Sequence, residues 1–266
     1  MKLIKPRFWD KNYLTFQSIL LYPFTFILDL RNLFFYFYKS KKYVEIKTIC
    51  VGNIYLGGTG KTPLTNLIAN KLKKKFKTAI IKKGYLDHLD EKRLLEKQNK
   101  VFFDKNRRTS LLKAIRAKFE LAIFDDGLQD KKIDYDIKIV CFNSLSLAGN
   151  QLRLPSGPLR ERLESLRKYD AVFIIGKNKN NKFLQKIKGI NRSIPIFYAE
   201  YISTNFKKFR KRNNIVFSGI GNPQSFINTL KQYGIRIKSK IIFPDHYYYT
   251  EADLKQIKQI AKKENL

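Results

Sequence analysis

Short apolar runs, separated by polar and glycine-containing segments, recur along this chain from residue 46 onward. Their length and their β-branched and aromatic residues are typical of buried strands. They lie at residues 46–51, 78–82, 121–125, 137–142, 171–175, 194–202, 215–218 and 235–243. Between the first two runs, apolar residues recur at helical spacing, at Leu64, Leu67, Ile68, Leu72 and Phe76. Alternating strands and helices predict an α/β fold.

Further helices are predicted after the later runs. One starts near residue 163, one follows the Gly-Ile-Gly-Asn-Pro segment at residues 219–223, and one starts at Thr250, where Asp253 completes a capping-box pattern. A charged helix is predicted just after residue 87. Residues 177–181 and 205–214 are rich in lysine and asparagine, and we expect exposed linkers there.

A glycine-rich segment lies between the first predicted strand and the first predicted helix. Its core is Gly57, Gly58, Thr59, Gly60, Lys61 and Thr62. Backbone N–H groups and a helix N-terminus bind phosphate in such a turn, a lysine adds positive charge, and a threonine hydroxyl can ligate Mg²⁺. The usual motif has glycine where this chain has Tyr55, so we interpret the segment as an atypical P-loop. The alternative is an ordinary glycine turn with a chance lysine.

Carboxylates follow two of the predicted strands. Asp125 and Asp126 end the strand at residues 121–125, where P-loop proteins hold a carboxylate that contacts Mg²⁺ directly or through water. A turn at Asp-Gly is the alternative for this pair. Asp90 and Glu91 lie beyond the strand at residues 78–82, and α/β folds carry their chemistry at such strand ends. A solvated helix start explains Asp90 and Glu91 equally well.

Two other polar segments are candidates for chemistry. Residues 149–162 form a loop that is too rich in glycine, proline and arginine for a core. Arg153, Arg160 and Arg162 can face a phosphate there, and Glu161 can face a metal. An arginine-rich surface loop is the alternative. His246 follows an aspartate at the end of a predicted strand, so it is a candidate acid–base or orienting residue. A lone histidine is more often structural.

The amino-terminal segment differs from the rest of the chain. Residues 13–38 are almost entirely apolar and aromatic, with lysines on both flanks, and are long enough to span a bilayer. Asp29 and Arg31 would each cost roughly 2.5 to 3.5 kcal/mol near a membrane centre, and Pro23 interrupts a helix. We therefore expect one or two helices in the membrane interface. A helical hairpin packed only on the protein's own core is the alternative, and a cleavable signal peptide is not expected.

Composition narrows the classes of partner only slightly. The net charge is +32, which favours anionic partners such as nucleic acid, an anionic bilayer or a phosphorylated substrate. The lysines are spread along the whole chain, so compositional drift explains them as well, and nucleic acid is not an expected partner. Cys50 and Cys141 both lie in apolar runs and are predicted to be buried thiols, without a disulfide or metal framework.

Several motifs together resemble the tetraacyldisaccharide 4'-kinase family. They are VGNIYLGGTGKTP (51–63), KGY (83–85), DDGLQD (125–130), GN…LPSGPLRE (149–161), FSGIGNPQSF (217–226) and FPDHYYYTEADL (243–254). In order and spacing they cover most of the chain.

The resemblance implies transfer of the ATP γ-phosphate to the 4'-hydroxyl of an acylated glucosamine disaccharide 1-phosphate, with Mg²⁺, at the cytoplasmic face of a bacterial inner membrane. It implies that residues 57–62 bind ATP, that Thr62, Asp125, Asp126 and Glu161 surround the metal, and that Arg160 and Lys61 act on the transferred phosphate. It assigns Asp90 as catalytic base and His246 as its partner. A carboxylate is needed because a sugar hydroxyl is a weak nucleophile. No obligate protein partner is implied.

The chain departs from the family pattern at several positions. Lys83 stands where the family has arginine, Asp130 where it has histidine, and Arg162 where it has proline. Family members usually continue through a further strand beyond the last helix, so a reduced carboxy-terminal domain is expected.

These observations predict three parts: a membrane-interfacial helical segment (1–45), a P-loop NTPase core (46–165) and a smaller α/β domain (166–266). The rival hypothesis is a membrane-targeted P-loop ATPase switch that phosphorylates no substrate and does not need Asp90 or His246. A nucleic-acid binder is motivated only by charge.

Overall fold

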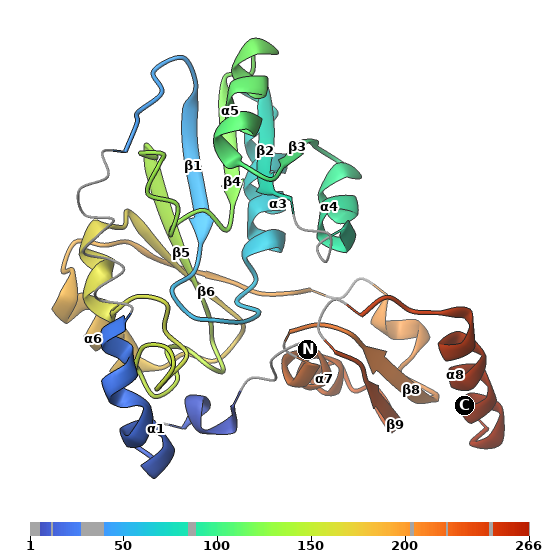
Figure 1. Ribbon diagram of the computed structural model, residues 1–266. Coiled ribbons are helices and arrows are strands. Elements are labelled where there is room, and N and C mark those ends of the chain that lie inside the picture. The colour runs from blue at the N-terminus through green and yellow to red at the C-terminus, as the bar shows by residue number, and fades with distance from the viewer. Residues whose placement is uncertain are drawn as a thin grey trace. The chain divides into compact units, whose positions relative to one another are not determined.

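The computed structural model describes residues 6–11, 13–27, 40–84, 89–202, 205–221, 223–244 and 247–265. The chain forms two compact units, a large one over Leu3–Ala199 and a small one made mainly of Glu200–Leu266 (Figure 1). The units divide after Ala199, not at the predicted position 165/166. The reason is that two strands beyond residue 165 belong to the sheet of the large unit.

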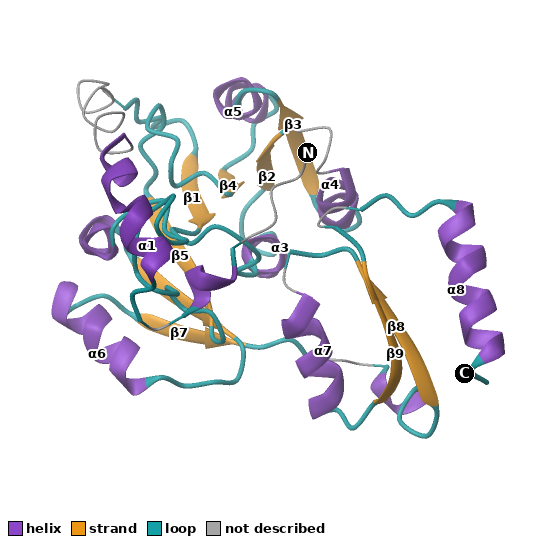
Figure 2. Cartoon of the chain, turned by 60° about the horizontal axis from the view of Figure 1, so that its bottom comes forward, coloured by secondary structure: helices purple, strands orange, loops and turns teal. Residues whose placement is uncertain are grey.

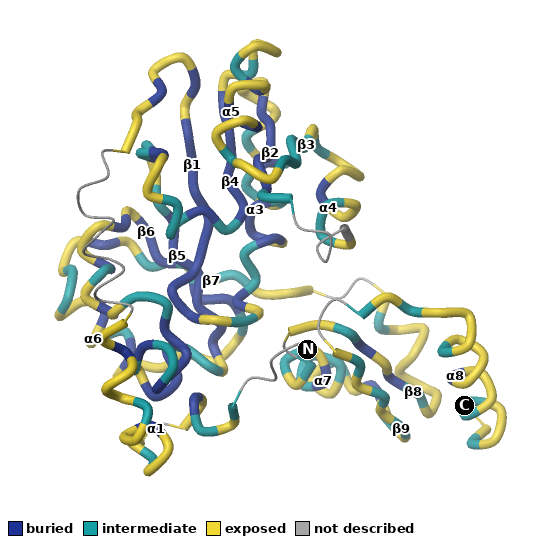
Figure 3. Tube along the Cα trace, viewed as in Figure 1, coloured by how far each residue is buried: buried dark blue, intermediate teal, exposed yellow. Residues whose placement is uncertain are grey.

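A seven-stranded sheet forms the centre of the large unit, and every pair of neighbouring strands is parallel. The strand order is β3-β2-β4-β1-β5-β6-β7. The bounds are β1 Lys47–Gly52, β2 Thr78–Lys83, β3 Lys100–Asp104, β4 Leu121–Asp125, β5 Ile137–Asn143, β6 Ala171–Ile175 and β7 Ile196–Ala199. Strands β1, β2 and β4 are buried along nearly their whole length (Figure 3), as expected for a parallel sheet covered on both faces.

Helices cover both faces of this sheet (Figures 1 and 2). Their bounds are α3 Lys61–Leu72, α4 Leu89–Glu96, α5 Arg107–Arg116 and α6 Asn181–Ile190, with the 3-10 helix η5 Leu163–Lys168 before β6. Alternate residues of β1 separate the two cores: Ile49 and Val51 pack with Leu64 of α3, whereas Cys50 packs with Leu111 of α5. The predicted α/β fold with a P-loop core is confirmed, and both cysteines are buried free thiols.

The amino-terminal elements belong to the large unit and contact the loop at residues 149–162 through hydrogen bonds. They are the 3-10 helix η1 Arg7–Asp10, α1 Phe16–Leu21 and the 3-10 helix η2 Tyr22–Phe24. Trp9 is buried and donates Nε1–H to the carbonyl of Pro155 at 3.0 Å. The Ser18 carbonyl accepts from Ser156 Oγ at 2.9 Å. In the part of the chain that the structure describes, no helix has the length and apolar character needed to cross a bilayer.

The loop at residues 149–162 has no regular secondary structure, as predicted, but much of it is buried. Ser156 and Leu159 are fully buried, and Gly157 lies so close to Asn150 Oδ1 and the Leu152 carbonyl that any added Cβ would clash. Arg153, expected to face a phosphate, is buried and donates Nη2–H to the Thr25 carbonyl at 3.3 Å. The expectation that glycine, proline and arginine exclude this loop from the core was wrong, because backbone carbonyls and hydroxyls satisfy its polar groups.

The small unit has two parallel strands, β8 Asn213–Ser218 and β9 Arg236–Ile242. Its helices are α7 Pro223–Gln232 and α8 Glu251–Lys263, with the 3-10 helix η6 Phe206–Lys208. The predicted capping box is present, because Thr250 Oγ1 accepts from the Asp253 N–H and the Asp253 carboxylate accepts from the Thr250 N–H. Residues along β9 alternate between exposed and half-buried, which is typical of a thin, one-sided sheet.

Candidate active site

The phosphate-binding loop connects β1 to α3 at the carboxyl end of the sheet. Gly60 caps α3 in the left-handed region, with φ 84° and ψ 20°, which glycine adopts without strain. Asn53 is fully buried and donates Nδ2–H to the Gly57 carbonyl at 3.2 Å and to Thr59 Oγ1 at 2.9 Å. These bonds fix the shape of the loop from inside, an arrangement in which backbone N–H groups of such a loop can bind an anion.

Asp125 ends β4 beside this loop and is 1 % exposed. It accepts from Thr62 Oγ1 at 2.9 Å, and Lys82 Nζ lies 2.5 Å from its Oδ2. The same ammonium lies 2.5 Å from Oε2 of Glu91. Burial disfavours the charged lysine, but the charges of Asp125 and Glu91 outweigh this and raise the pKa of Lys82 above its usual value. Lys82 is therefore a buried ammonium between two carboxylates.

Asp126 lies among cations at the same strand end. Arg160 Nη1 lies 3.1 Å from its Oδ1 and Lys61 Nζ lies 3.7 Å from its Oδ2. Arg107 donates to its backbone carbonyl. Burial alone would raise the pKa of the Asp126 carboxyl, but Lys61, Arg160 and Arg107 together lower it. The backbone of Asp126 is left-handed, with φ 58°, a conformation that few residues other than glycine adopt.

The loop at residues 149–162 brings Arg160 to this cluster. Its backbone pairs with the phosphate-binding segment: Leu56 donates N–H to the Pro158 carbonyl at 2.8 Å and Arg160 donates to the Ile54 carbonyl at 2.7 Å. Gln129 then joins Arg160 to Glu161, accepting from Arg160 Nη1 at 3.1 Å and donating to Glu161 Oε1 at 2.9 Å. Glu161 also accepts from the Tyr169 hydroxyl and pairs with Lys168 at 3.0 Å.

The predicted catalytic residues are brought together only in part. Thr62 contacts Asp125, while Lys61 and Arg160 contact the neighbouring Asp126. Glu161 joins the second group through Gln129. Asp90 is exposed in the first turn of α4, next to Glu91. His246 lies outside the described residues.

The donors at this strand end suit Mg²⁺. Thr62 and Asp125 offer oxygen atoms at the end of a phosphate-binding loop, and Mg²⁺ in kinase sites is held by one or two carboxylates together with waters and substrate phosphates. Among the residues that the structure describes, no three His, Cys, Asp or Glu side chains gather as a preformed metal site.

Three residues of the cluster were missed from the sequence: Lys82, Arg107 and Gln129. Arg107 forms an ion pair with Asp130 at 3.3 Å, so the aspartate that replaces the family's histidine has a partner here. A lysine inside an apolar strand run was the available signal for Lys82, because lysine is rarely buried unless it is paired. No sequence signal indicated Arg107, because it lies far along the chain on an unpredicted helix.

Comparison with known proteins agrees with this geometry. The model of the family described as tetraacyldisaccharide-1-P 4'-kinase matches residues 17–266. A tetraacyldisaccharide 4'-kinase of Pelagibacter ubique is 46% identical over 271 residues, covering 100% of this chain and 85% of that protein. One from Rickettsia bellii is 32% identical, covering 100% and 86%.

A solved structure is also similar. The crystal structure of LpxK from Aquifex aeolicus in complex with ATP has a TM-score of 0.66 and 26% identity, covering 88% of this chain and 84% of that one. The family match extends over most of the sequence, including the phosphate-binding loop and the ends of β2 and β4. The chain belongs to the tetraacyldisaccharide 4'-kinase family.

Proposed function

We propose that this protein transfers the γ-phosphate of ATP to the 4'-hydroxyl of an acylated glucosamine disaccharide 1-phosphate. The observation that carries the proposal is a pair of adjacent contact groups at the end of a phosphate-binding loop, in a chain of this family: Thr62 with Asp125, and Lys61 and Arg160 with Asp126. A relative of known structure is described in complex with ATP.

Phosphoryl transfer needs charge stabilisation more than covalent chemistry, because negative charge spreads over the transferred oxygens. Residues 57–62 are the proposed ATP site. Lys61 is proposed to neutralise the β- and γ-phosphates. Arg160 is proposed to stabilise charge that develops on the transferred group, and the Asp126 carboxylate 3.1 Å away orients its guanidinium.

Thr62, Asp125 and Asp126 are the proposed holders of Mg²⁺, with Glu161 at the edge of the cluster. These residues would hold Mg²⁺, which would supply positive charge against the phosphate groups. Thr62 and Asp125 are held together by a hydrogen bond of 2.9 Å, so the chain itself orients these oxygens.

The acceptor side is proposed to use Asp90 and His246. A sugar hydroxyl becomes an effective nucleophile when a carboxylate accepts its proton, and Asp90 is the proposed base. Its exposed position beside Glu91 supports access by a large substrate. His246 is proposed to orient this carboxylate.

We also propose that the protein works at the cytoplasmic face of a bacterial inner membrane, attached by the segment that contains α1 and η2. Buried Ser18 and Thr25 face the protein here, while apolar side chains are exposed. The exposed apolar residues are Phe16, Ile19, Leu20, Tyr22, Phe24, Phe26 and Ile27. A segment with polar groups inward and apolar groups outward is suited to the acyl boundary of a bilayer.

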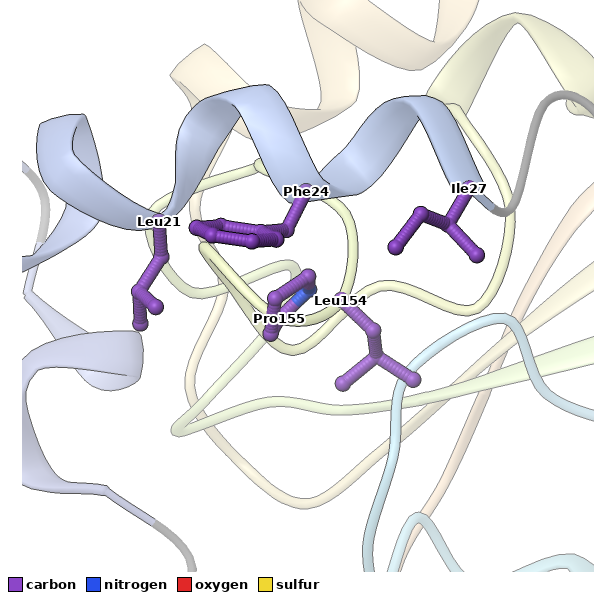
Figure 4. A pocket seen from close by; sticks show the side chains of 5 residues that line it. All are labelled: Leu21, Phe24, Ile27, Leu154 and Pro155. Carbon is purple, nitrogen blue, oxygen red and sulfur yellow. The ribbon is translucent and has the colours of Figure 1, made fainter.

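An apolar pocket lies beside this segment (Figure 4). It has a volume of ≈ 480 Å³ and is lined by Leu21, Phe24, Ile27, Leu154 and Pro155. Its lining suits an acyl chain. Leu154 and Pro155 belong to the same loop as Arg160, which supports one loop contacting both the lipid and the phosphate ends of the reaction.

The test uses the purified protein with ATP, Mg²⁺ and the disaccharide 1-phosphate in detergent micelles. Mass spectrometry should find a product heavier by one phosphate, and Lys61→Met should abolish it. Asp90→Ala and His246→Ala should lose turnover while ATP affinity is kept. Lipid-stimulated ATP hydrolysis without a phosphorylated lipid would contradict the proposal and favour a membrane-targeted ATPase switch.

A further inference from the structure

Lys82 lies where the register of the sheet brings it beside Asp125. Strands β2 and β4 are parallel neighbours, and Lys82 is directly opposite Asp125. Side chains at paired positions point to the same face of a sheet, so both face the layer that contains α3 and α4. Lys82 is 5 % exposed and its ammonium is 2.5 Å from both Asp125 and Glu91.

Glu91 connects this buried cation to helix α4. Glu91 and Leu95 are four residues apart, so they lie on the same face of the helix. Leu95 is fully buried and packs in the core that also contains Ile80 of β2. Helix α4 is therefore anchored to the sheet by an apolar contact at Leu95 and by an ion pair at Glu91, one turn nearer its start.

A simple neutralising role does not account for this arrangement. Thr62 already donates a hydrogen bond to Asp125, and an ammonium paired with Asp125 alone would compensate its charge. The second carboxylate, Glu91, comes from a different element and is adjacent in sequence to Asp90. The bridge thus ties the element that carries the proposed base to the strand end that carries a proposed metal ligand.

We propose that Lys82 is a positioning residue of the kinase site: its ammonium bridges Asp125 and Glu91 and fixes the first turn of α4, and with it Asp90, at the phosphate-binding end of the sheet. The proposal rests on the proposed function for the meaning of Asp90 and Asp125. The bridge is made by the chain's own side chains, and its effect on α4 is measurable without turnover.

Hydrogen–deuterium exchange of α4 in the full-length protein is the primary test. The variants are Lys82→Met, Glu91→Gln and both together. Arg93→Met is the matched control, because Arg93 is on the same helix and is exposed to solvent. We expect amides of α4 to exchange about ten-fold faster in Lys82→Met and in Glu91→Gln. Arg93→Met should leave the exchange unchanged.

The double variant should exchange no faster than Lys82→Met alone, because both changes remove the same bridge. Exchange of α4 at the wild-type rate in Glu91→Gln would overturn the proposal. Glu91→Gln leaves the Lys82–Asp125 pair intact, so it still tests the proposal if Lys82→Met does not fold. Faster exchange through the whole sheet in Lys82→Met, with Glu91→Gln like wild type, would reduce Lys82 to a structural countercharge.

Kinetics separate positioning from metal or nucleotide binding. With the disaccharide acceptor, Glu91→Gln should lower kcat about ten-fold and leave KM for ATP within about three-fold, since a misplaced base affects the chemical step. An unchanged kcat would contradict the proposal. If the wild-type protein makes no phosphorylated lipid, the proposed function fails, whereas the exchange experiment still decides whether Lys82 holds α4.

Discussion

The phosphate-binding end of the sheet and the exposed face of the amino-terminal segment are built in opposite ways. At the sheet end, charged side chains form ion pairs with one another: Asp125 with Lys82, and Asp126 with Arg160. At the amino-terminal face, hydroxyl groups point inward while Phe24 and its apolar neighbours are exposed. In the first region the chain's own side chains match one another's charges. In the second, among the described residues, large apolar side chains are exposed, which is typical of a surface that a membrane or a partner covers.

The loop at residues 149–162 contacts both regions. Leu154 and Pro155 line the apolar pocket, and Arg160 reaches Asp126 a few residues later. Changes in the polar region should therefore act on the chemical step and on stability, and changes in the apolar region on membrane binding. The following predictions test this separation.

Asp125→Asn should have the largest effect. The substitution leaves the buried Lys82 ammonium with Glu91 as its partner and removes a proposed metal ligand. We expect phosphotransfer to fall by about 10³-fold or more and the free energy of unfolding to fall by about 3–5 kcal/mol. Initial rates and urea unfolding measure both. Asp134→Asn, which removes an exposed carboxylate paired with Lys138, is the control and should change neither.

Arg160→Lys should have the second-largest effect. A lysine keeps the charge but loses the planar guanidinium with its several N–H donors. In the structure the Nη1 of this guanidinium contacts both Asp126 and Gln129. We expect kcat to fall about 10²-fold with KM for ATP nearly unchanged. Arg162→Lys is the control, because Arg162 is exposed two residues along the same loop. Equal kinetics for the two variants would show that Arg160 does not act on the transferred phosphate.

Phe24→Ser should weaken membrane binding and spare the chemistry. Phe24 is 54% exposed and lines the apolar pocket. Loss of its burial in lipid should lower partitioning to anionic vesicles about ten-fold. Co-sedimentation measures this, and turnover on a short-chain acceptor in detergent should remain. Phe209→Ser removes a similarly exposed phenylalanine, 50% exposed, from the small unit. An equal loss in that variant would mean that the amino-terminal face has no special role.

The smallest effect should be the pH dependence of stability at Asp126. Neighbouring cations lower the pKa of this carboxyl in the folded state, so its ion pairs stabilise the fold above the unfolded value of about 3.9. That stabilisation is lost as pH falls through the lowered folded-state pKa. Asp126→Asn should therefore cost about 1 kcal/mol at pH 7, and the difference from wild type should shrink at low pH. Chemical denaturation of the variant and of wild type, at pH 7 and at low pH, measures this difference in the free energy of unfolding.

The stability difference between Phe24→Ser and wild type should not depend on pH, because no charge is involved. A pH-independent cost of Asp126→Asn would contradict the electrostatic account of that residue.

Most of the fold was predictable because its central strands each contain a run of buried apolar residues. The strands β1, β4 and β6 were predicted to within a residue or two of their bounds. Strand β3 and helix α5 were not predicted. Strand β3 has only three apolar residues. The hydrophobic signal of α5 is diluted by exposed Arg108, Lys113 and Arg116. Helix α6 was not predicted either. It starts at Asn181, the last residue of the linker expected at residues 177–181.

The site residues that were predicted are those whose signal lies within one short segment of the sequence. Residues in local motifs, such as Lys61 and Thr62, were predicted because the motif and its flanking elements are contiguous in the sequence. Lys82 and Arg107 were missed because their roles depend on which strands become neighbours: β4 lies between β1 and β2, so Asp125 reaches residues far apart in the chain. Strand order is a property of the whole chain and cannot be read from one segment.

The left-handed backbone at Asp126 restricts which residues can occupy this position. Glycine, asparagine and aspartate adopt this conformation more readily than residues with longer side chains, such as glutamate. The surrounding cations require a negative charge. The backbone conformation favours a few residue types at position 126, and among them only aspartate carries a negative charge. Aspartate is thus selected twice at this position, by two independent physical criteria.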